Sequence, residues 1–481
     1  MTTRRAGERH VVIIGAGITG LAAAAHLVQH EPTISVTVLE QSERVGGVIH
    51  ASPFAGLDSV DESADAFLVR SPSALELTSL VGLGNDLVHP ATGEAYIWHD
   101  ELHDIPVNTV LGVPASFGSI WSTPLFSPRA KVRASLEPLL PRRRGRTSAS
   151  LGGAIRARFG NEVLERVVDP LVGGIYATDT DSFSVHGMPQ LDELLAGRRS
   201  LMSGAREMLA TRRESGPVFA APRAGMSALV SSTADFVRSR GASLLTNSRV
   251  NSIRRDGDRY VVVGDANDVV ADATIVTSPA KHSAPILNAL SGDAAAMLEQ
   301  REHASIVMVT LAVSRAQWPE WLNGSGYLVT KPRQTAITAA SFASNKWAHL
   351  RGADGAMILR ISLGRDGMPM HHHDDETLVK LALADLNWHL DLDLQPHAHR
   401  VTRWIDSFPQ YRPGHEAHVS QLDQVLANDA PGVVLAGASY RGIGIPACVA
   451  DGRRAARVIA ERLDRKSTRL NSSHSSVSRM P

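Results

Sequence analysis

Residues 10–20 read His-Val-Val-Ile-Ile-Gly-Ala-Gly-Ile-Thr-Gly, a short apolar strand that runs into three glycines. Gly15 allows a sharp turn, Gly17 allows backbone amides to approach a ligand, and Gly20 allows the next helix to lie close to the sheet. The N-terminus of that helix, Leu21–His30, presents free N–H groups and a partial positive charge. This order predicts an α/β fold that binds the diphosphate of a dinucleotide, with Ala16, Ile18 and Thr19 completing the turn.

The next strand and the loop after it indicate which dinucleotide is bound. The strand Ser35–Glu40 ends in a carboxylate twenty positions after Gly20, where it can accept hydrogen bonds from ribose hydroxyls. Glu43-Arg44-Val45-Gly46-Gly47 follows. Adjacent glycines permit a second close backbone approach, and Arg44 offers a fixed fork for phosphate oxygens. A flavin whose extended tail runs along the protein needs this second approach, so FAD is favoured over a nicotinamide cofactor.

Composition limits the other classes of function. The 481 residues exceed what one compact core usually supports, which predicts two or three domains. Lys plus Arg and Asp plus Glu balance at 49 each, so no global field attracts nucleic acid. A single cysteine, Cys448, excludes an internal disulfide and suits a reducing compartment. We therefore expect a cytoplasmic protein that binds no nucleic acid, with a peripheral membrane contact left open.

A second motif of a strand, a glycine-rich turn and a helix lies near the end of the chain. The strand Val433–Ala436 is followed by a glycine-rich turn, Gly437–Pro446, and by the helix Ala447–Leu463. In a flavin enzyme such a helix N-terminus belongs near the pyrimidine end of the isoalloxazine, where it stabilises negative charge on the reduced ring.

We predict a Rossmann-like FAD-binding domain assembled from separated stretches of chain. Its segments are residues 9–70, 215–285 and 400–464. Residues 71–210 are expected to form a helical domain that lines the substrate pocket, and residues 286–399 a substrate-binding domain. Residues 465–481 are serine-rich and lack a core pattern, so they are expected to be a disordered or foreign tail.

Three further segments carry a family resemblance. They are Phe-Gly-Asn-Glu-Val-Leu-Glu-Arg-Val-Val-Asp-Pro-Leu-Val-Gly-Gly-Ile-Tyr-Ala at residues 159–177, the turn at Gly225, and the stretch Gly437–Cys448. Together with the N-terminal unit they resemble the bacterial porphyrinogen oxidases of haem biosynthesis, within the flavin amine oxidase superfamily. The resemblance implies oxidation of coproporphyrinogen III to coproporphyrin III, or of protoporphyrinogen IX to protoporphyrin IX; we favour the first. It also implies molecular oxygen as acceptor, hydrogen peroxide as by-product, and transient contact with a ferrochelatase.

The resemblance also implies the flavin contacts. They are Gly15, Ala16, Gly17, Ile18, Thr19, Gly20, Glu40, Gln41, Arg44, Gly47, Val48, Ser63, Ala64, Asp65, Ala66, Val250, Trp404, Ile443, Gly444 and Ile445. The segment Ser63–Ala66 departs from the Gly-Pro-Asp-Ser of relatives, so only its backbone is expected to serve. No arginine in Ala95–His103 matches the carboxylate-binding residue of relatives, which leaves the contacts to the substrate's propionates unassigned.

The same resemblance implies a substrate slot at a glycine-rich helix break. Gly174, Ile175 and Tyr176 are the expected slot residues, with packing as the alternative role for Tyr176. No side chain is expected to act as a catalytic acid, base or nucleophile, because the flavin N5 accepts the hydride and aromatisation of the macrocycle drives the reaction. The run His371-His372-His373 is interpreted as a solvated loop and not a metal site, since consecutive histidines in a turn cannot all face one ion.

Two alternatives remain open from the sequence. An amine oxidase would share the FAD domain but should place a lysine beside N5 and build an aromatic cage, whereas aromatic residues make up only 5% of the chain. A tetrapyrrole carrier that keeps FAD for structure would bind porphyrinogen without reducing the flavin.

Overall fold

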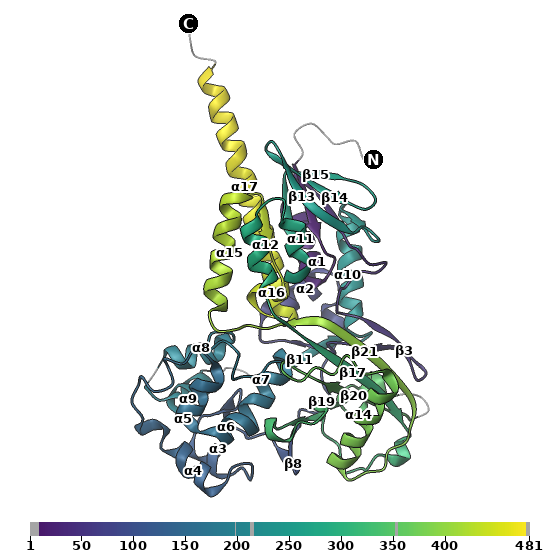
Figure 1. Cartoon of the computed structure of the whole chain (residues 1–481). Helices are drawn as coiled ribbons and strands as arrows, with labels where there is room; N and C mark the ends of the chain where they lie inside the picture. The colour runs from purple at the N-terminus through teal and green to yellow at the C-terminus, as the bar shows by residue number, and fades with distance from the viewer. Residues whose placement is uncertain (1–8, 198, 212–215, 352–354, 478–481) are drawn as a thin grey trace.

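The computed structural model describes residues 9–197, 199–211, 216–351 and 355–477, with side chains described up to residue 465. Its first body is a parallel sheet in the order β12-β2-β1-β16-β22. The strands are β1 (Arg9–Ile14), β2 (Ile34–Leu39), β12 (Ser243–Leu245), β16 (Ala273–Val276) and β22 (Val433–Leu435). The order brings strands from three distant stretches of chain together, and the whole molecule is shown in Figure 1.

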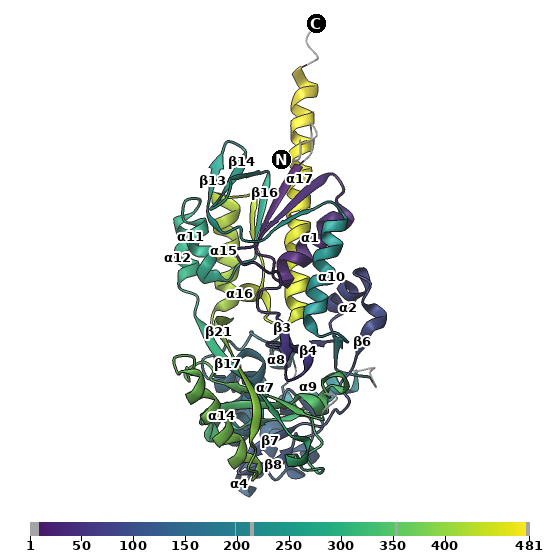
Figure 2. The same ribbon diagram turned by 90° about the vertical axis from the view of Figure 1, so that its right-hand side faces the viewer.

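Both faces of this sheet are covered, which explains why its strands are almost continuously apolar. Val11 and Ile13 of β1 face a core shared with α1 (Ile18–His30), α10 (Met226–Ser239) and α17 (Ile445–Val477). Val12 and Ile14 face a second core. That core is covered by β13 (Val250–Asp256), β14 (Arg259–Gly264), β15 (Val269–Ala271), α11 (Ala280–Leu287), α12 (Gly292–Glu299) and α15 (His415–Asp429). Figure 2 shows these elements on opposite sides of the sheet.

A seven-stranded sheet forms the second body, in the order β21-β17-β20-β19-β18-β7-β8. Its strands are β7 (Tyr96–His99), β8 (Glu101–Asp104), β17 (His303–Val313), β18 (Gly326–Val329), β19 (Ile337–Phe342), β20 (Met357–Leu363) and β21 (Pro396–Pro409). Helix α14 (Asp375–Leu390) covers one face through Leu378, Ala382 and Leu386, which recur at helical spacing. The third body, beside it in Figure 1, is helical and surrounds its own core. Its helices are α3 (Phe117–Trp121), α4 (Pro128–Ser135), α5 (Leu151–Phe159), α6 (Asn161–Val163), α7 (Asp169–Tyr176), α8 (Pro189–Ala196) and α9 (Leu201–Ala210), with a π-helical turn at Leu164–Val168.

The remaining helices and strands are short. They are β3 (Ala51–Phe54), β4 (Leu57–Asp61), β5 (Phe67–Leu68), α2 (Pro72–Leu80), β6 (Leu87–Val88), β9 (Thr109–Val110), β10 (Val113–Pro114), β11 (Phe219–Pro222), α13 (Ala343–Lys346) and α16 (Ala438–Arg441). Turns of 3-10 helix cover Gly84–Asp86, Glu137–Leu139, Arg315–Gln317, Lys331–Arg333 and Ala348–Leu350.

The structure differs from the sequence-based expectation in three places. Residues 71–210 are not purely helical, because β7 pairs with β18 and so joins the seven-stranded sheet. Residues 400–409, which were expected in the FAD-binding domain, join the same sheet as part of β21. The expected disordered tail is helical over residues 465–477, where it continues α17 beyond the body of the molecule (Figure 1). No glycine or proline lies between Gly452 and Pro481, so no strong helix breaker ends the helix within this stretch. Residues 478–481 lie outside the described residues.

Candidate cofactor and substrate site

The first glycine turn connects β1 to α1. Gly15 has φ +99°, and a Cβ there would lie 2.8 Å from Oγ1 of Thr277. A Cβ on Gly20 would collide with the carbonyl oxygen of Gly15. A Cβ on Gly17, in contrast, would meet no atom within 4 Å. Packing therefore requires Gly15 and Gly20, whereas Gly17 keeps an open space in front of the helix N-terminus, which fits the diphosphate of a dinucleotide.

The second pair of glycines lies directly against this turn. Gly17 and Gly46 form a parallel bridge, and the N–H of Gly46 donates to the carbonyl of Ala16 at 2.8 Å. Gly47 is exposed, has φ +59°, and its Cβ position would meet only the Cα of Gly17, at 3.5 Å. The two open glycines thus border one cradle. This cradle, defined by residues 15–20 and 46–47, fits the extended diphosphate of FAD.

Residues expected at the ribose and adenine end gather around the end of β2. The Glu40 carboxylate accepts hydrogen bonds from the N–H groups of Ala16, at 2.8 Å, and Ser42, at 2.9 Å. The Glu40 carbonyl accepts from the N–H of Ser248 at 2.7 Å, which brings the loop before Val250 beside it. The side chain of Val250 is buried in the core that contains Val12 and Ile14.

The other expected contacts in this loop are more open. Gln41 and Val48 are exposed. Arg44 is half-buried and donates one hydrogen bond, 3.4 Å long, to the carbonyl of Val45. The Arg44 guanidinium retains donors that can reach a phosphate oxygen.

The second glycine turn lies at the start of α17, which packs along α1. The N–H of Gly437 donates to the Asp451 carboxylate at 2.8 Å, and a Cβ on Gly437 would lie 3.5 Å from Oγ1 of Thr19. Gly444 is exposed, Ile445 is buried, and Ile443 packs against the helical body. The two glycine turns are therefore neighbours, as a ligand that spans both helix N-termini requires.

Sequence reasoning missed the group that braces this second turn. The Tyr411 hydroxyl donates to the carbonyl of Ala438 at 2.6 Å and accepts from the N–H of Gly442 at 2.7 Å. The Tyr411 ring stacks on His415, with ring centroids 3.8 Å apart. The ring of His415 in turn contacts the carbonyl of Tyr440 at 2.8 Å. Burial, followed by the Arg301 guanidinium, lowers the pKa of His415 to about 3, so this imidazole is neutral at pH 7.

The segment Ser63–Ala66 is held by polar side chains from α13, the residue after it, and β20. Asp65 accepts from Lys346 at 2.9 Å and from the indole N–H of Trp347 at 3.0 Å. Arg360 pairs with Asp65 and donates to the carbonyl of Ser63. Burial alone would raise the pKa of Asp65, but Lys346 and Arg360 hold it well below its usual range. No sequence pattern pointed to Lys346, Trp347 or Arg360.

A buried polar atom in this segment has no protein partner. The Oγ of Ser63 is buried and makes no hydrogen bond within the described part of the chain. The indole N–H of Trp404 donates to the carbonyl of the preceding residue, Glu62, at 3.0 Å. Trp404 and the segment Ser63–Ala66 are therefore brought together, and the unpaired hydroxyl fits a polar atom of a bound cofactor.

The predicted slot residues on α7 differ in their exposure to solvent. Gly174 is exposed, and the Ile175 side chain is 43% exposed. Tyr176 is buried, with its ring centroid 4.8 Å from that of Phe183 and 5.9 Å from that of Tyr411. Burial raises the pKa of Tyr176 to about 12. Gly174 and Ile175 can face a substrate directly, whereas Tyr176 packs between α7 and the second glycine turn.

A buried ion pair fixes α7 against the seven-stranded sheet. Asp169, at the start of α7, accepts from Arg365 at 2.7 Å and 3.0 Å through its two carboxylate oxygens. Both side chains are nearly inaccessible to solvent. The pair therefore orients the exposed face of α7 relative to the strands that carry Trp404 and Arg360.

The histidine run forms a turn beside β21. Arg403 donates to the carbonyls of His371 and His373, which holds the run as a turn. Within the described ranges, no group of three His, Cys, Asp or Glu side chains is arranged to hold a metal ion. Nor does any helix there combine the length and apolarity needed to cross a membrane.

Comparisons with known proteins show which family this chain belongs to. The model of the flavin containing amine oxidoreductase family matches residues 18–460. A Bacillus subtilis (strain 168) protein named coproporphyrinogen III oxidase is 32% identical over 93% of this chain and 97% of its own length. A protoporphyrinogen oxidase of Macaca fascicularis is 25% identical over 93% of this chain and 98% of its own. A solved structure from Exiguobacterium sp. 255-15, provisionally named a protoporphyrinogen oxidase, superposes with a TM-score of 0.82 at 28% identity, covering 94% of this chain and 98% of that one.

Proposed function

The chain belongs to the flavin containing amine oxidoreductase family, and from that premise we propose that it oxidises coproporphyrinogen III to coproporphyrin III with bound FAD. The observation that carries this proposal is the near-full-length match to proteins named coproporphyrinogen III oxidase. The fold alone would not carry it, because one fold serves many reactions. Protoporphyrinogen IX is the second candidate substrate, favoured by the names of the Macaca and Exiguobacterium proteins.

The cradle would hold FAD along two helix N-termini. Gly17 and Gly47 leave open space that the diphosphate would occupy, and Glu40, whose carboxylate accepts from the N–H of Ala16, would bind the ribose hydroxyls. The start of α17 would offer its partial positive charge to the flavin, and Tyr411 fixes the turn that leads into it. When bound, FAD supplies the two-electron acceptor for removal of hydride from the macrocycle.

The polypeptide itself would position the substrate and exclude water. Ile175 and Gly174 offer an apolar edge of α7 for a flat macrocycle, and the Asp169–Arg365 pair keeps that edge in place. No side chain needs to take up the meso hydrogen. The porphyrinogen would lose two electrons and two protons in each of three rounds, which makes six electrons in all. In each round the two electrons would pass to oxygen, which would form hydrogen peroxide.

One lysine lies beside a segment that is expected to contact the flavin. Lys346, beside the segment Ser63–Ala66, is engaged by the Asp65 carboxylate at 2.9 Å and 3.0 Å. This ion pair ties Lys346 to the segment Ser63–Ala66.

The same proposal includes the electron acceptor, the protein that receives the product and the cellular location. Molecular oxygen would reoxidise the flavin, the porphyrin product would pass to a ferrochelatase during transient contact, and the reaction would occur in the cytoplasm. A peripheral membrane contact would use the exposed side chains of Phe117, Trp121 and Val132 on α3 and α4. Oxygen consumption, co-sedimentation with anionic vesicles and cross-linking to ferrochelatase test these points separately.

The proposed function is tested by the fluorescence of newly formed porphyrin. Purified FAD-loaded protein is mixed under air with coproporphyrinogen III or with protoporphyrinogen IX at equal concentrations. A larger kcat/KM for coproporphyrinogen III is expected. Faster oxidation of protoporphyrinogen IX would assign the second candidate, and absence of porphyrin from both would refute the proposal.

A further inference from the structure

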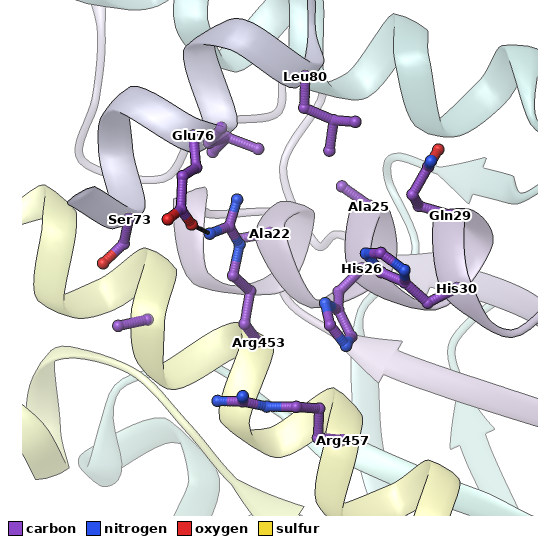
Figure 3. Close-up of a pocket in the computed structure, with 12 residues that line it drawn as sticks. Ala22, Ala25, His26, Gln29, His30, Ser73, Glu76, Leu80, Arg453 and Arg457 are labelled. Atoms are coloured by element: carbon purple, nitrogen blue, oxygen red, sulfur yellow. Dashed lines mark hydrogen bonds and ion pairs between the residues drawn. The ribbon is translucent and has the colours of Figure 1, made fainter.

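A groove between α1, α2 and α17 lies outside the cofactor cradle (Figure 3). Its volume is about 480 Å³. His26, which lines it, lies eight residues along α1 from Ile18, or ~12 Å at the rise of an α-helix. The groove is therefore separate from the glycine turns, and the proposed oxidation makes no use of it.

Basic side chains from two helices converge on this groove. His26 and His30 are four residues apart on α1, and Arg453 and Arg457 are four apart on α17, so each pair shares one helix face. Figure 3 shows all four around one opening, and the two imidazole centroids are 4.6 Å apart. Four groups able to donate hydrogen bonds thus surround one space.

The groove has fewer acidic side chains than basic side chains. Among the described residues that line it, Glu76 is the one acidic side chain, and it pairs with Arg453. The Glu76 side chain is 59% exposed, so the pair is a weak surface contact that an incoming anion can replace. Arg457 makes no ion pair within the described ranges.

The neighbouring basic groups act on His26 in the same direction as its burial. Burial, then His30, Arg457 and Arg453, lower the pKa of His26 to about 4. The charged groups around this imidazole are thus one histidine on its own helix, two arginines of α17, and Glu76 of α2. The local field disfavours a further positive charge, and a bound anion would relieve it.

The floor of the groove is apolar. Ala22 and Ala25 of α1, Ala450 of α17, and Leu77 and Leu80 of α2 line it. The alanine side chains end at Cβ, so they leave space where longer side chains would fill it. A volume of about 480 Å³ falls in the range of small-molecule sites and exceeds what an inorganic ion needs. The two arginines would repel a metal cation.

We propose that this groove binds a small organic anion, whose carboxylate or phosphate group is held by Arg453, Arg457 and His26 and whose apolar body rests on the alanine and leucine floor. Guanidinium groups suit this role because their planar fork matches the two oxygens of an oxyanion. The site lies on the FAD-binding body and does not depend on which porphyrinogen the protein oxidises.

The test uses the full-length, FAD-loaded protein and three probes. Phenyl phosphate carries both the charge and an apolar body, inorganic phosphate carries the charge alone, and benzyl alcohol carries the body alone. Isothermal titration calorimetry should show saturable binding of phenyl phosphate, at least tenfold weaker binding of inorganic phosphate, and none of benzyl alcohol. The imidazole resonances of His26 and His30 should shift together with the phenyl phosphate titration.

Two matched variants locate the binding. Arg457→Gln should weaken phenyl phosphate at least tenfold, whereas Arg465→Gln should leave the affinity unchanged. Arg465 is also an exposed arginine of α17 but pairs with Glu461 further along the helix. Circular dichroism and flavin absorbance verify that both variants are folded and loaded. The proposal is overturned by the absence of saturable binding, by equal affinity for inorganic and phenyl phosphate, or by equal effects of the two substitutions.

Discussion

The phenol oxygen of Tyr411 lies 2.7 Å from the backbone nitrogen of Gly442 and accepts its hydrogen bond. The same ring lies 5.9 Å from the ring of Tyr176, on the helix that carries the proposed substrate edge. Tyr411 therefore touches both the glycine turn at the start of α17 and the helix α7. It connects the proposed cofactor surface to the helix of the proposed substrate surface.

Replacing Tyr411 with Phe should loosen the second glycine turn. The change keeps the ring but leaves the N–H of Gly442 without its partner, at a cost of about 1–3 kcal/mol. We expect a lower thermal midpoint and weaker retention of FAD during gel filtration. Tyr96→Phe is the control, because the Tyr96 ring packs against Gly324 and lies far from the turn in the fold. Equal FAD retention in Tyr411→Phe and wild type would contradict this assignment.

Gly17→Ala and Gly15→Ala should fail for different reasons. A Cβ at Gly17 meets no protein atom within 4 Å, so Gly17→Ala should fold normally yet lose FAD because the methyl group enters the diphosphate space. Gly15→Ala is strained at φ +99° and lies against Thr277, so it should lower the thermal midpoint itself. Gly292→Ala, also in open space, is the control. Normal FAD affinity in folded Gly17→Ala would place the diphosphate elsewhere.

Asp61→Asn should remove a pH dependence of stability. Burial raises the pKa of Asp61 to about 7, against the opposing influence of Arg360. An unfolded aspartate titrates near pH ~4, so between about pH 4 and 7 the unfolded chain loses the proton that the native protein retains. Stability contributed by this group therefore falls as pH rises across that window, by up to about 4 kcal/mol.

The Asp61→Asn variant keeps an oxygen that can accept from the N–H of Met226. Thermal midpoints of wild type and variant should converge at about pH 4 and diverge in favour of the variant above about pH 7. Asp58→Asn, at an exposed position of β4, serves as the control. Parallel profiles for wild type and Asp61→Asn would show that Asp61 is not the titrating group.

Ile175→Ser should impair substrate use without affecting FAD. The exposed Ile175 side chain offers apolar surface to the macrocycle, and removing it forfeits about 1.5–3 kcal/mol if that surface becomes buried on binding. We expect kcat/KM to fall ~10- to 100-fold with an unchanged flavin content. Val107→Ser changes an exposed apolar residue, 69% accessible, as the comparison. A variant at Ile175 with wild-type kinetics would move the slot away from this edge.

The N-terminal unit could be predicted from the sequence because its information is local. Residues 10–20 specify strand, turn and helix within one short stretch, and β1, α1 and β2 form where the apolar runs and glycines place them. The strand and helix around Gly437–Pro446 were predictable for the same reason. The contact between this second turn and the first glycine turn depends on the tertiary structure, and the sequence only suggested it.

What the sequence did not reveal depends on contacts between distant residues. Lys346 and Asp65 are 281 positions apart, and neither belongs to a recognisable motif. Tyr96 pairs with Tyr327, which moves β7 out of the expected helical segment. Tyr176 is buried because its ring packs against Phe183 and Tyr411. Its position in the helix alone could not show whether the side chain packs in the core or contacts the substrate.

The most direct test of the account is anaerobic mixing of the yellow, FAD-loaded protein with coproporphyrinogen III in a stopped-flow spectrometer. The proposed oxidase should lose its oxidised flavin absorbance as the macrocycle is oxidised, and should regain it when oxygen is admitted. A flavin spectrum that stays oxidised in the presence of bound coproporphyrinogen III would contradict the account, because it would mean that the two surfaces described above do not exchange electrons.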